Sequence, residues 1–285
     1  FEHATRLAML KAGEADIVEL IGPHIPAVKS DPNLTLHQIK YVIGYTLEFS
    51  DLLFPDEQSP FKDIRVRKAV SLAIDRKMIC EKILFGDAEP WGEVLCPYNF
   101  GYDSSIKPDP YDPEKAIALL KEAGYPKGFE TRFCTSIRDK YYVEPIVSNL
   151  ADIGIVAKLE VFEGGAWYGA HKGRKLRGIK TRSTWYDAEP HPGADILEGL
   201  RSSSQWAYGK LPGVDEALDA SLWAKNDEEA AEWGRKLSKM VRKDYRRPIL
   251  WAKHSSFGLS KKIVKWEPQG GSYPGTRFEY IEIKE

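Results

Sequence analysis

The chain has 285 residues, and its 41 Lys plus Arg nearly cancel its 42 Asp plus Glu, leaving a formal net charge of −1. This balance gives no global attraction to nucleic acid or to an anionic membrane, and no apolar run approaches the roughly 18–20 residues that span a bilayer. The length suits one large domain or two modest ones. Because the first residue is Phe1, we expect the sequence to be part of a longer chain whose N-terminus, with a signal peptide, has been removed.

The first 60 residues predict a helix, a strand, a second helix and two further strands. Gly13 closes the first helix, and residues 15–20 form the first strand. Residues 35–49 alternate loosely between apolar and polar side chains, which is typical of extended structure. Residues 51–60 contain two prolines and are predicted to be a linker.

Residues 61–125 are predicted to be mainly helical, with a Pro- and Gly-rich loop over residues 87–110. Asp63 and Asp75 are suited to cap two successive helices, the second ending at Gly86. A third helix is predicted to begin after the cap residue Asp112, with a proline at its first position, and to end at Gly124-Tyr125-Pro126.

Residues 129–162 predict the clearest supersecondary unit. An alternating strand (129–135) precedes a helix (142–153), and a second alternating strand (155–162) follows Gly154. A strand, helix and strand of these lengths indicate a right-handed parallel crossover. Downstream, the sequence predicts a strand at 176–185, a long helix at 226–242 capped by Asn226 with Glu229, and a short strand at 248–252.

Two motifs in this order resemble the family 5 extracellular solute-binding proteins, the peptide- and nickel-type receptors of ABC importers. The first is Pro60-Phe61-Lys62-Asp63-Ile64-Arg65-Val66-Arg67-Lys68-Ala69, and the second runs from Tyr111-Asp112-Pro113 to Ala123-Gly124-Tyr125-Pro126. A weaker third match begins at Arg6 and ends at Asp16-Ile17. The resemblance implies an α/β protein with a periplasmic binding protein-like type II fold, here as one complete lobe plus a partial second lobe.

The same resemblance implies boundaries for these parts. Residues 1–50 would be a partial lobe I segment, 51–60 the hinge, 61–250 a complete lobe II, and 251–285 a crossing strand that returns to lobe I. We therefore expect residues 1–50 to lie outside the sheet that contains residues 129–162.

The implied function is capture of a small solute between the lobes and its delivery to a membrane ABC permease. A peptide is the family default, and a carbohydrate or an opine is the alternative. The resemblance implies no cofactor and no chemistry, a monomer, and a periplasmic or extracellular location, membrane-anchored if the protein is a lipoprotein. Although the family includes nickel receptors, we expect no metal here.

The candidate ligand contacts lie where strands end. Ligands gather at the carboxyl ends of strands in open α/β sheets, which indicates Ser136 and Arg138 after one strand and Trp185 after another. The family places a Trp at the second position, followed by an Asp that binds the ligand's amino group. Here Asp187 follows Trp185, although alignment on the family's proline puts Ala188 at the Asp position. Arg182 is near enough to Trp185 to meet an anionic ligand group.

A basic run offers a rival interpretation, since it places six cations within eleven residues: Lys172, Arg174, Lys175, Arg177, Lys180 and Arg182. Such a run could bind phosphate or a nucleic-acid backbone. Because the run contains two glycines, we favour its interpretation as a solvated loop and strand edge. Because the net charge of the chain is balanced, we expect no nucleic-acid partner.

Other chemistry is weakly indicated. Several carboxylates at 187–198 could supply the pair that a glycan hydrolase needs, but acidic loops are common. His171 and His191 are too far apart in sequence for a helical metal pair. The cysteines, Cys80, Cys96 and Cys134, have no metal-binding spacing and are interpreted as buried thiols, with a Cys80–Cys96 disulfide left open.

Overall fold

The computed structural model describes residues 2–54, 58–186, 199–207, 210–267 and 281–284. Its main sheet has seven strands in the order β1-β7-β2-β6-β4-β5, with β3 paired to β7. The strands of this sheet are β1 (Ile17–Leu20), β2 (Leu34–Phe49), β3 (Ala88–Pro90), β4 (Phe129–Ser136), β5 (Ile155–Phe162), β6 (Ile179–Trp185) and β7 (Ile249–Ser260). A separate ribbon pairs β8 (Ile263–Lys265) with β9 (Glu282–Ile283).

The predicted parallel crossover is confirmed. β4 and β5 pair in parallel from Phe129 opposite Ile155 to Ser136 opposite Phe162, and α6 (Lys140–Asp152) connects them. Gly154, at φ 88°, makes the turn from α6 into β5. β6 also runs parallel to β4, so three strands share the same carboxyl edge.

The predicted helix starts are also confirmed. Asp63 caps α3 (Ile64–Leu72) by accepting from the Arg65 amide, and Asp75 caps α4 (Arg76–Met78), which continues as a π-helix over Ile79–Ile83. Asp112 caps α5 (Pro113–Glu122), and Asn226 caps α10 (Asp227–Asp244). Each cap satisfies a first-turn amide that the helix itself leaves unpaired.

Two further helices were predicted, α1 (His3–Ala12) and α2 (Ile25–Lys29). Two others were not predicted, α7 (Gly164–Lys172) and α9 (Val214–Leu222). α7 is rich in glycine, which is a poor helix former.

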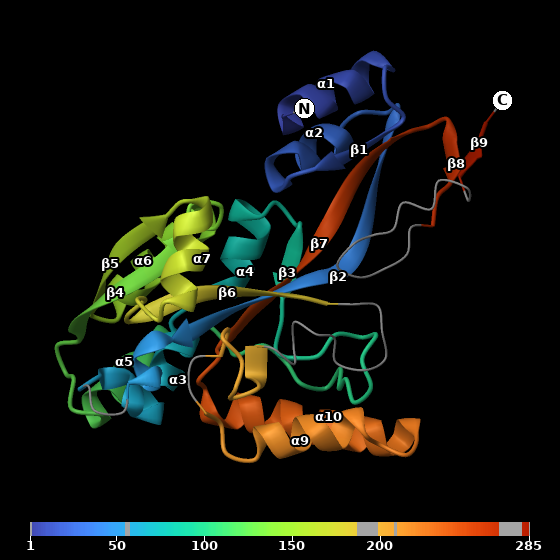
Figure 1. The fold of residues 1–285 in the computed structure, drawn as a ribbon. Helices are drawn as coiled ribbons and strands as arrows, with labels where there is room; N and C mark the ends of the chain where they lie inside the picture. Colours follow the sequence, from blue (N-terminus) through green and yellow to red (C-terminus); the bar gives the residue numbers. More distant parts are fainter. Residues whose placement is uncertain (1, 55–57, 187–198, 208–209, 268–280, 285) are drawn as a thin grey trace.

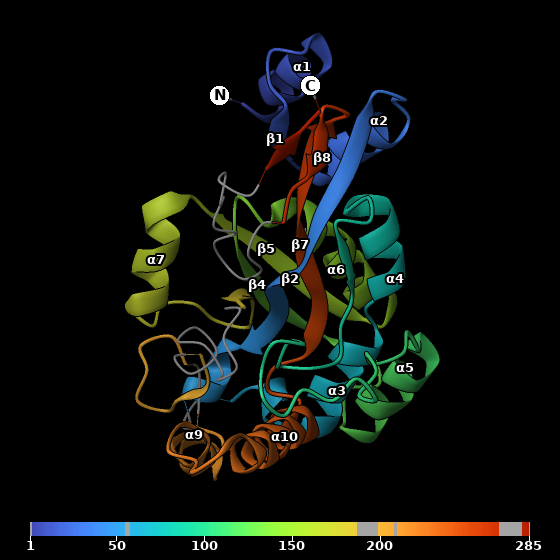
Figure 2. The same ribbon diagram turned by 90° about the vertical axis from the view of Figure 1, so that its right-hand side faces the viewer.

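The two long strands β2 and β7 connect an upper part to a lower part of the molecule. Figure 1 shows α1, α2 and β1 at one end, and α3, α5, α9 and α10 at the other, with β2 and β7 passing between them. The turned view in Figure 2 shows the same separation. Buried residues divide similarly: one small cluster joins α1, β1 and α2, while the largest joins α3, α5, α6 and β4 to the lower halves of β2 and β7.

The expectation that residues 1–50 lie outside the sheet of residues 129–162 is wrong. Residues 34–49 form one strand of 16 residues rather than two strands, and its second half pairs with β6, the neighbour of β4. The physical reason is that the end of this strand is buried, with Leu47 and Phe49 in the largest core cluster, so the strand continues into the core of the lower part. β7 is likewise longer than predicted, with 12 residues instead of five.

The three cysteines are buried and free, so the interpretation as buried thiols is confirmed and Cys80 does not pair with Cys96.

Candidate ligand-binding edge at β4 and β6

The ends of β4 and β6 bring predicted site residues to one edge. Cys134 lies opposite Lys180 in the parallel ladder, and one residue later the hydroxyls of Thr135 and Thr181 are 3.1 Å apart. Both strands run toward the same carboxyl edge, where Ser136 ends β4 level with Arg182 and β6 continues three residues farther to Trp185. Trp185 is 38% exposed, so part of this aromatic residue is accessible at this edge.

The turn after β4 orients Ser136 and Arg138 differently. Ser136 is 5% exposed, and its hydroxyl accepts from the Arg138 amide at 3.4 Å. The Asp139 amide donates to the Ser136 carbonyl at 2.9 Å, which closes the turn. Arg138 itself is exposed. Its guanidinium is thus the group of this turn that a charged ligand can reach.

Asp139 belongs to this edge and was missed in the sequence. It precedes α6, and burial raises the pKa of its carboxyl to about 6, although Tyr142, Arg138 and Thr181 each favour the ionised form. The buried Tyr142 and the half-buried Tyr45 lie beside it, with ring centroids 5.2 Å apart. The signal available was an Asp three residues before the predicted helix 142–153, a residue type that is suited to cap a helix.

Trp185 is also adjacent to the long strand β2. It lies opposite Ile43 in the antiparallel ladder, and the next amide, that of Tyr186, donates to the Val42 carbonyl at 2.9 Å. The candidate edge therefore touches the strand that connects the upper and lower parts. Asp187 lies outside the described residues.

The interpretation of the basic run as a solvated loop and strand edge holds for Lys172 and Lys175, which are exposed. It is wrong for Lys180 and Arg182 of β6, which are engaged inside the protein. β6 lies between β2 and β4, and Lys180 is fully buried in an ion pair with Glu48 of β2. Arg182 is 8% exposed, with its Nε 3.8 Å from Glu48. Glu48 lies 132 residues before Lys180, so no local pattern could show that this cation has a buried partner.

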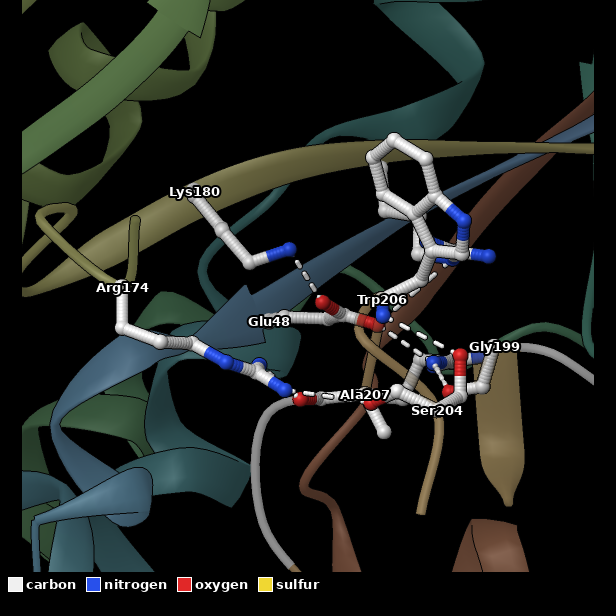
Figure 3. A network of polar contacts seen from close by, with 9 residues as sticks. Glu48, Arg174, Lys180, Gly199, Ser204, Trp206 and Ala207 are labelled. Atoms are coloured by element: carbon white, nitrogen blue, oxygen red, sulfur yellow. Dashed lines mark hydrogen bonds and ion pairs between the residues drawn. The ribbon is translucent and has the colours of Figure 1, made fainter. Parts of the chain in front are cut away.

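Figure 3 shows how this network extends. Arg247 donates to Glu48 and to the Gly199 carbonyl, while Arg174 donates to the carbonyls of Ala207 and, at 3.1 Å, Ser204. Burial by itself would raise the pKa of Glu48, but Lys180, Arg247 and Arg182 lower it to about 2. The network joins β2, β6 and the segment before β7 directly behind the candidate edge.

Among the described residues, no group of three or more His, Cys, Asp or Glu side chains is arranged to hold a metal ion. In that same part of the chain, no helix combines the length and apolar character needed to cross a bilayer.

Comparisons with known proteins agree with this architecture. Residues 1–205 match the family model described as bacterial extracellular solute-binding proteins, family 5 middle. Heme-binding protein A of Haemophilus influenzae is 34% identical over 246 residues, covering 81% of this chain and 43% of that protein. The glutathione-binding protein GsiB of Salmonella choleraesuis is 31% identical over 240 residues, covering 80% of this chain and 46% of that protein.

A solved structure shows the same fold. The periplasmic binding protein DppA from Helicobacter pylori, in complex with the peptide STSA, superimposes with a TM-score of 0.81 at 22% identity. The match covers 100% of this chain and 56% of that one. The chain thus spans less than half the length of the two curated relatives and somewhat more than half of this structure.

Proposed function

The chain belongs to the bacterial extracellular solute-binding proteins of family 5, and from that premise we propose that the full-length protein is the substrate-binding receptor of an ABC importer. It captures a small solute between two lobes and delivers it to a membrane permease. It is a binding protein and performs no chemistry. It acts outside the cytoplasmic membrane, in the periplasm or at the cell surface, as a monomer.

The observation that carries the proposal is the exposed Trp185 at the shared carboxyl edge of β4 and β6, next to the crossing strand β2. An aromatic surface with a few convergent polar groups is typical of small-ligand sites. The exposed guanidinium of Arg138 lies on the neighbouring turn. This edge lies below the upper part of the molecule (Figure 1), and the proposal places the ligand between the two parts.

We propose a small peptide as the ligand. One relative is named for glutathione, itself a tripeptide, and another for heme, so the name of a relative alone does not fix the ligand. Trp185 provides the apolar surface, Arg138 and Ser136 the polar contacts, and Asp187 the partner of a cationic group. Arg182 supports the end of β6 from behind, because it is nearly buried beside Glu48.

Native mass spectrometry of the full-length protein, followed by calorimetry, tests this function. We expect a co-purifying solute or one member of a di- and tripeptide panel to bind in a 1:1 complex. Trp185→Ala should weaken that binding at least about tenfold, since losing a well-packed aromatic contact costs more than about 1.4 kcal/mol. Trp223→Ala is the matched control, because Trp223 follows α9 and is 82% exposed. Equal affinity for the Trp185 variant and wild type would refute this placement of the site.

A thermal-shift screen with a peptide panel beside a sugar and opine panel separates the peptide from the other ligands. Stabilisation by a sugar or an opine, with no response to any peptide, would replace the ligand class and keep the receptor.

A further inference from the structure

The carboxyl of Asp139 lies on the same face of the sheet as the exposed Trp185. It lies beside the Thr181 side chain of β6, which lowers its pKa. Thr181, Ser183 and Trp185 point to one face of β6, because side chains alternate along a strand. Thr181 and Trp185 are about 13 Å apart, at about 3.3 Å per residue. The two ends of the candidate edge are thus a carboxylate and an aromatic surface.

Three tyrosines lie around the Asp139 carboxyl. The half-buried Tyr45 is opposite Ser183 in the ladder and contacts the buried Tyr142 edge to face. The ring of Tyr141, which is 47% exposed, lies 5.3 Å from that of Tyr142. Burial raises the pKa of each hydroxyl, and the charge of Asp139 raises it further. Aromatic faces beside a carboxylate favour a cation.

Asp139 differs from the other carboxylates near this edge in lacking an ion-pair partner within the described chain. Glu48 and Asp87 each form an ion pair with a lysine. The exposed Arg138 lowers the pKa of Asp139 but does not pair with it. Burial nevertheless raises the pKa of Asp139 to about 6. The ionised carboxylate therefore loses more by desolvation than its neighbours return.

A buried hydroxyl beside Asp139 is also unsatisfied. Tyr142 is 1% exposed, and its hydroxyl has no hydrogen-bond partner of normal geometry among the described residues. It comes near enough to the Asp139 carboxyl to lower the pKa of that group, but the alignment falls short of a hydrogen bond. A buried polar group left in this condition costs free energy. A further polar molecule at the site accounts for it.

Building on the receptor function proposed above, we propose that Asp139, with Tyr45 and Tyr141 around it, binds a cationic side chain of the peptide ligand. The preferred substrates are then peptides that contain lysine or arginine. The ammonium or guanidinium supplies the missing positive charge and donates charge-assisted hydrogen bonds to the carboxylate. The tyrosine rings provide the faces on which the cation rests.

The N-terminal ammonium is the other cation that a peptide carries. The function proposed above assigns it to Asp187, two residues beyond Trp185. Because Trp185 is about 13 Å along β6 from Thr181, beside which Asp139 lies, one ammonium does not serve both ends of the edge. The cation at Asp139 is therefore assigned to a side chain.

The test measures how affinity depends jointly on the charge of the ligand and on Asp139. Calorimetry on the full-length protein at pH 7.5 compares tripeptides that carry lysine at each position in turn with the same peptides carrying norleucine, which lacks the ammonium. We expect wild type to bind one lysine peptide about tenfold more tightly than its norleucine counterpart. In Asp139→Asn the two affinities should become equal, because the affinity for the lysine peptide falls.

Two controls accompany this variant. Asp139→Asn keeps the shape of the side chain and removes a charge that is costly to bury, so its melting temperature at pH 7.5 should match that of wild type. Asp152→Asn changes an exposed carboxylate at the other end of α6 and should keep the lysine preference. An undiminished lysine preference in Asp139→Asn would overturn the proposal.

Tyr141→Leu is the second variant, for use if Asp139→Asn does not fold. The Tyr141 ring is 47% exposed, so its removal leaves the core intact. Losing one aromatic face should reduce the lysine preference about threefold. An unchanged preference in Tyr141→Leu would count against the proposal in the same way.

N-acetylated lysine peptides separate the two cations of the ligand. The lysine preference and its dependence on Asp139 should persist after acetylation. If Asp139 instead distinguishes free from acetylated peptides, the N-terminal ammonium occupies this place and the side-chain assignment is wrong. Equal binding of lysine and norleucine peptides by wild type would refute the assignment and keep the receptor. Binding of no peptide at all would refute the peptide function proposed above together with it.

Discussion

Glu48 of β2 and Lys180 of β6 form a fully buried ion pair that joins strands distant in sequence. Arg247 donates to the same carboxylate, and Arg182 lies 3.8 Å from it. One buried carboxylate therefore compensates several cations directly behind the candidate ligand edge. Its contribution is the specific alignment of β6 on the crossing strand, since removing it leaves charge buried without compensation.

The substitution Glu48→Gln should therefore destabilise the fold strongly. Leaving Lys180 and Arg247 without a carboxylate is expected to cost about 3–5 kcal/mol, measured by urea unfolding. Glu19→Gln is the control, because Glu19 pairs with Arg6 at an exposed site where the loss is about 1 kcal/mol or less. Similar losses of unfolding free energy in the two variants would show that the buried network stabilises the fold no more than an exposed ion pair does.

His254 should make stability fall as the solution is acidified. Burial, with Lys40 and Lys253, lowers its pKa to about 3, so the folded protein keeps the ring neutral while the unfolded chain protonates it below about 6.5. Stability is then lost as pH falls from 6.5 toward 3. Between pH 7.5 and 5, wild type should lose about 2 kcal/mol more than His254→Gln. Parallel pH profiles of the two proteins in urea unfolding would contradict this assignment.

Asp139 should act in the opposite direction. Burial raises its pKa to about 6, so the folded protein takes up a proton as pH falls through 6 while the unfolded chain does so only near 3.8. This group adds stability as pH falls from 7 to 4. Asp139→Asn should remove that gain, seen as a steeper loss of melting temperature on acidification than in wild type. Asp152→Asn, at the exposed end of α6, is the control.

Residues 1–285 alone should bind the ligand much more weakly than the full-length protein. The chain spans less than half the length of its curated relatives, and a site that encloses a ligand buries about 70–90% of its surface. Residues 1–285 would supply only part of the surface that encloses the ligand, while the entropy cost of association would be the same as in the full-length protein. Calorimetry on the two proteins side by side measures the difference. Equal affinities would place the site wholly within the part described here.

Local sequence features predicted the helix starts and the parallel crossover. The caps Asp63, Asp112 and Asn226 act within three residues of themselves, and the β4–α6–β5 unit follows from periodicity and Gly154. The motifs also indicated the family, which the match over residues 1–205 confirms.

What the sequence left open depends on contacts between distant residues. Lys180 belongs to a basic run that looks solvated until Glu48 is placed beside it. β2 has a bulge at residues 40–42, between Ile39 opposite Ser255 and Ile43 opposite Lys253 of β7. This bulge exists only relative to β7, some 200 residues later, so the alternation at 35–49 could not distinguish one bent strand from two. Trp185 and Arg138 were predicted as contacts from the ends of their strands, and their role in binding stays a prediction.

Small-angle X-ray scattering of the full-length protein tests the receptor account most directly. The ligand is the solute identified by native mass spectrometry, added to saturation. The account predicts a smaller radius of gyration at 1:1 stoichiometry, because the upper and lower parts close on the ligand through β2 and β7. An unchanged radius of gyration with a tightly bound ligand would contradict it.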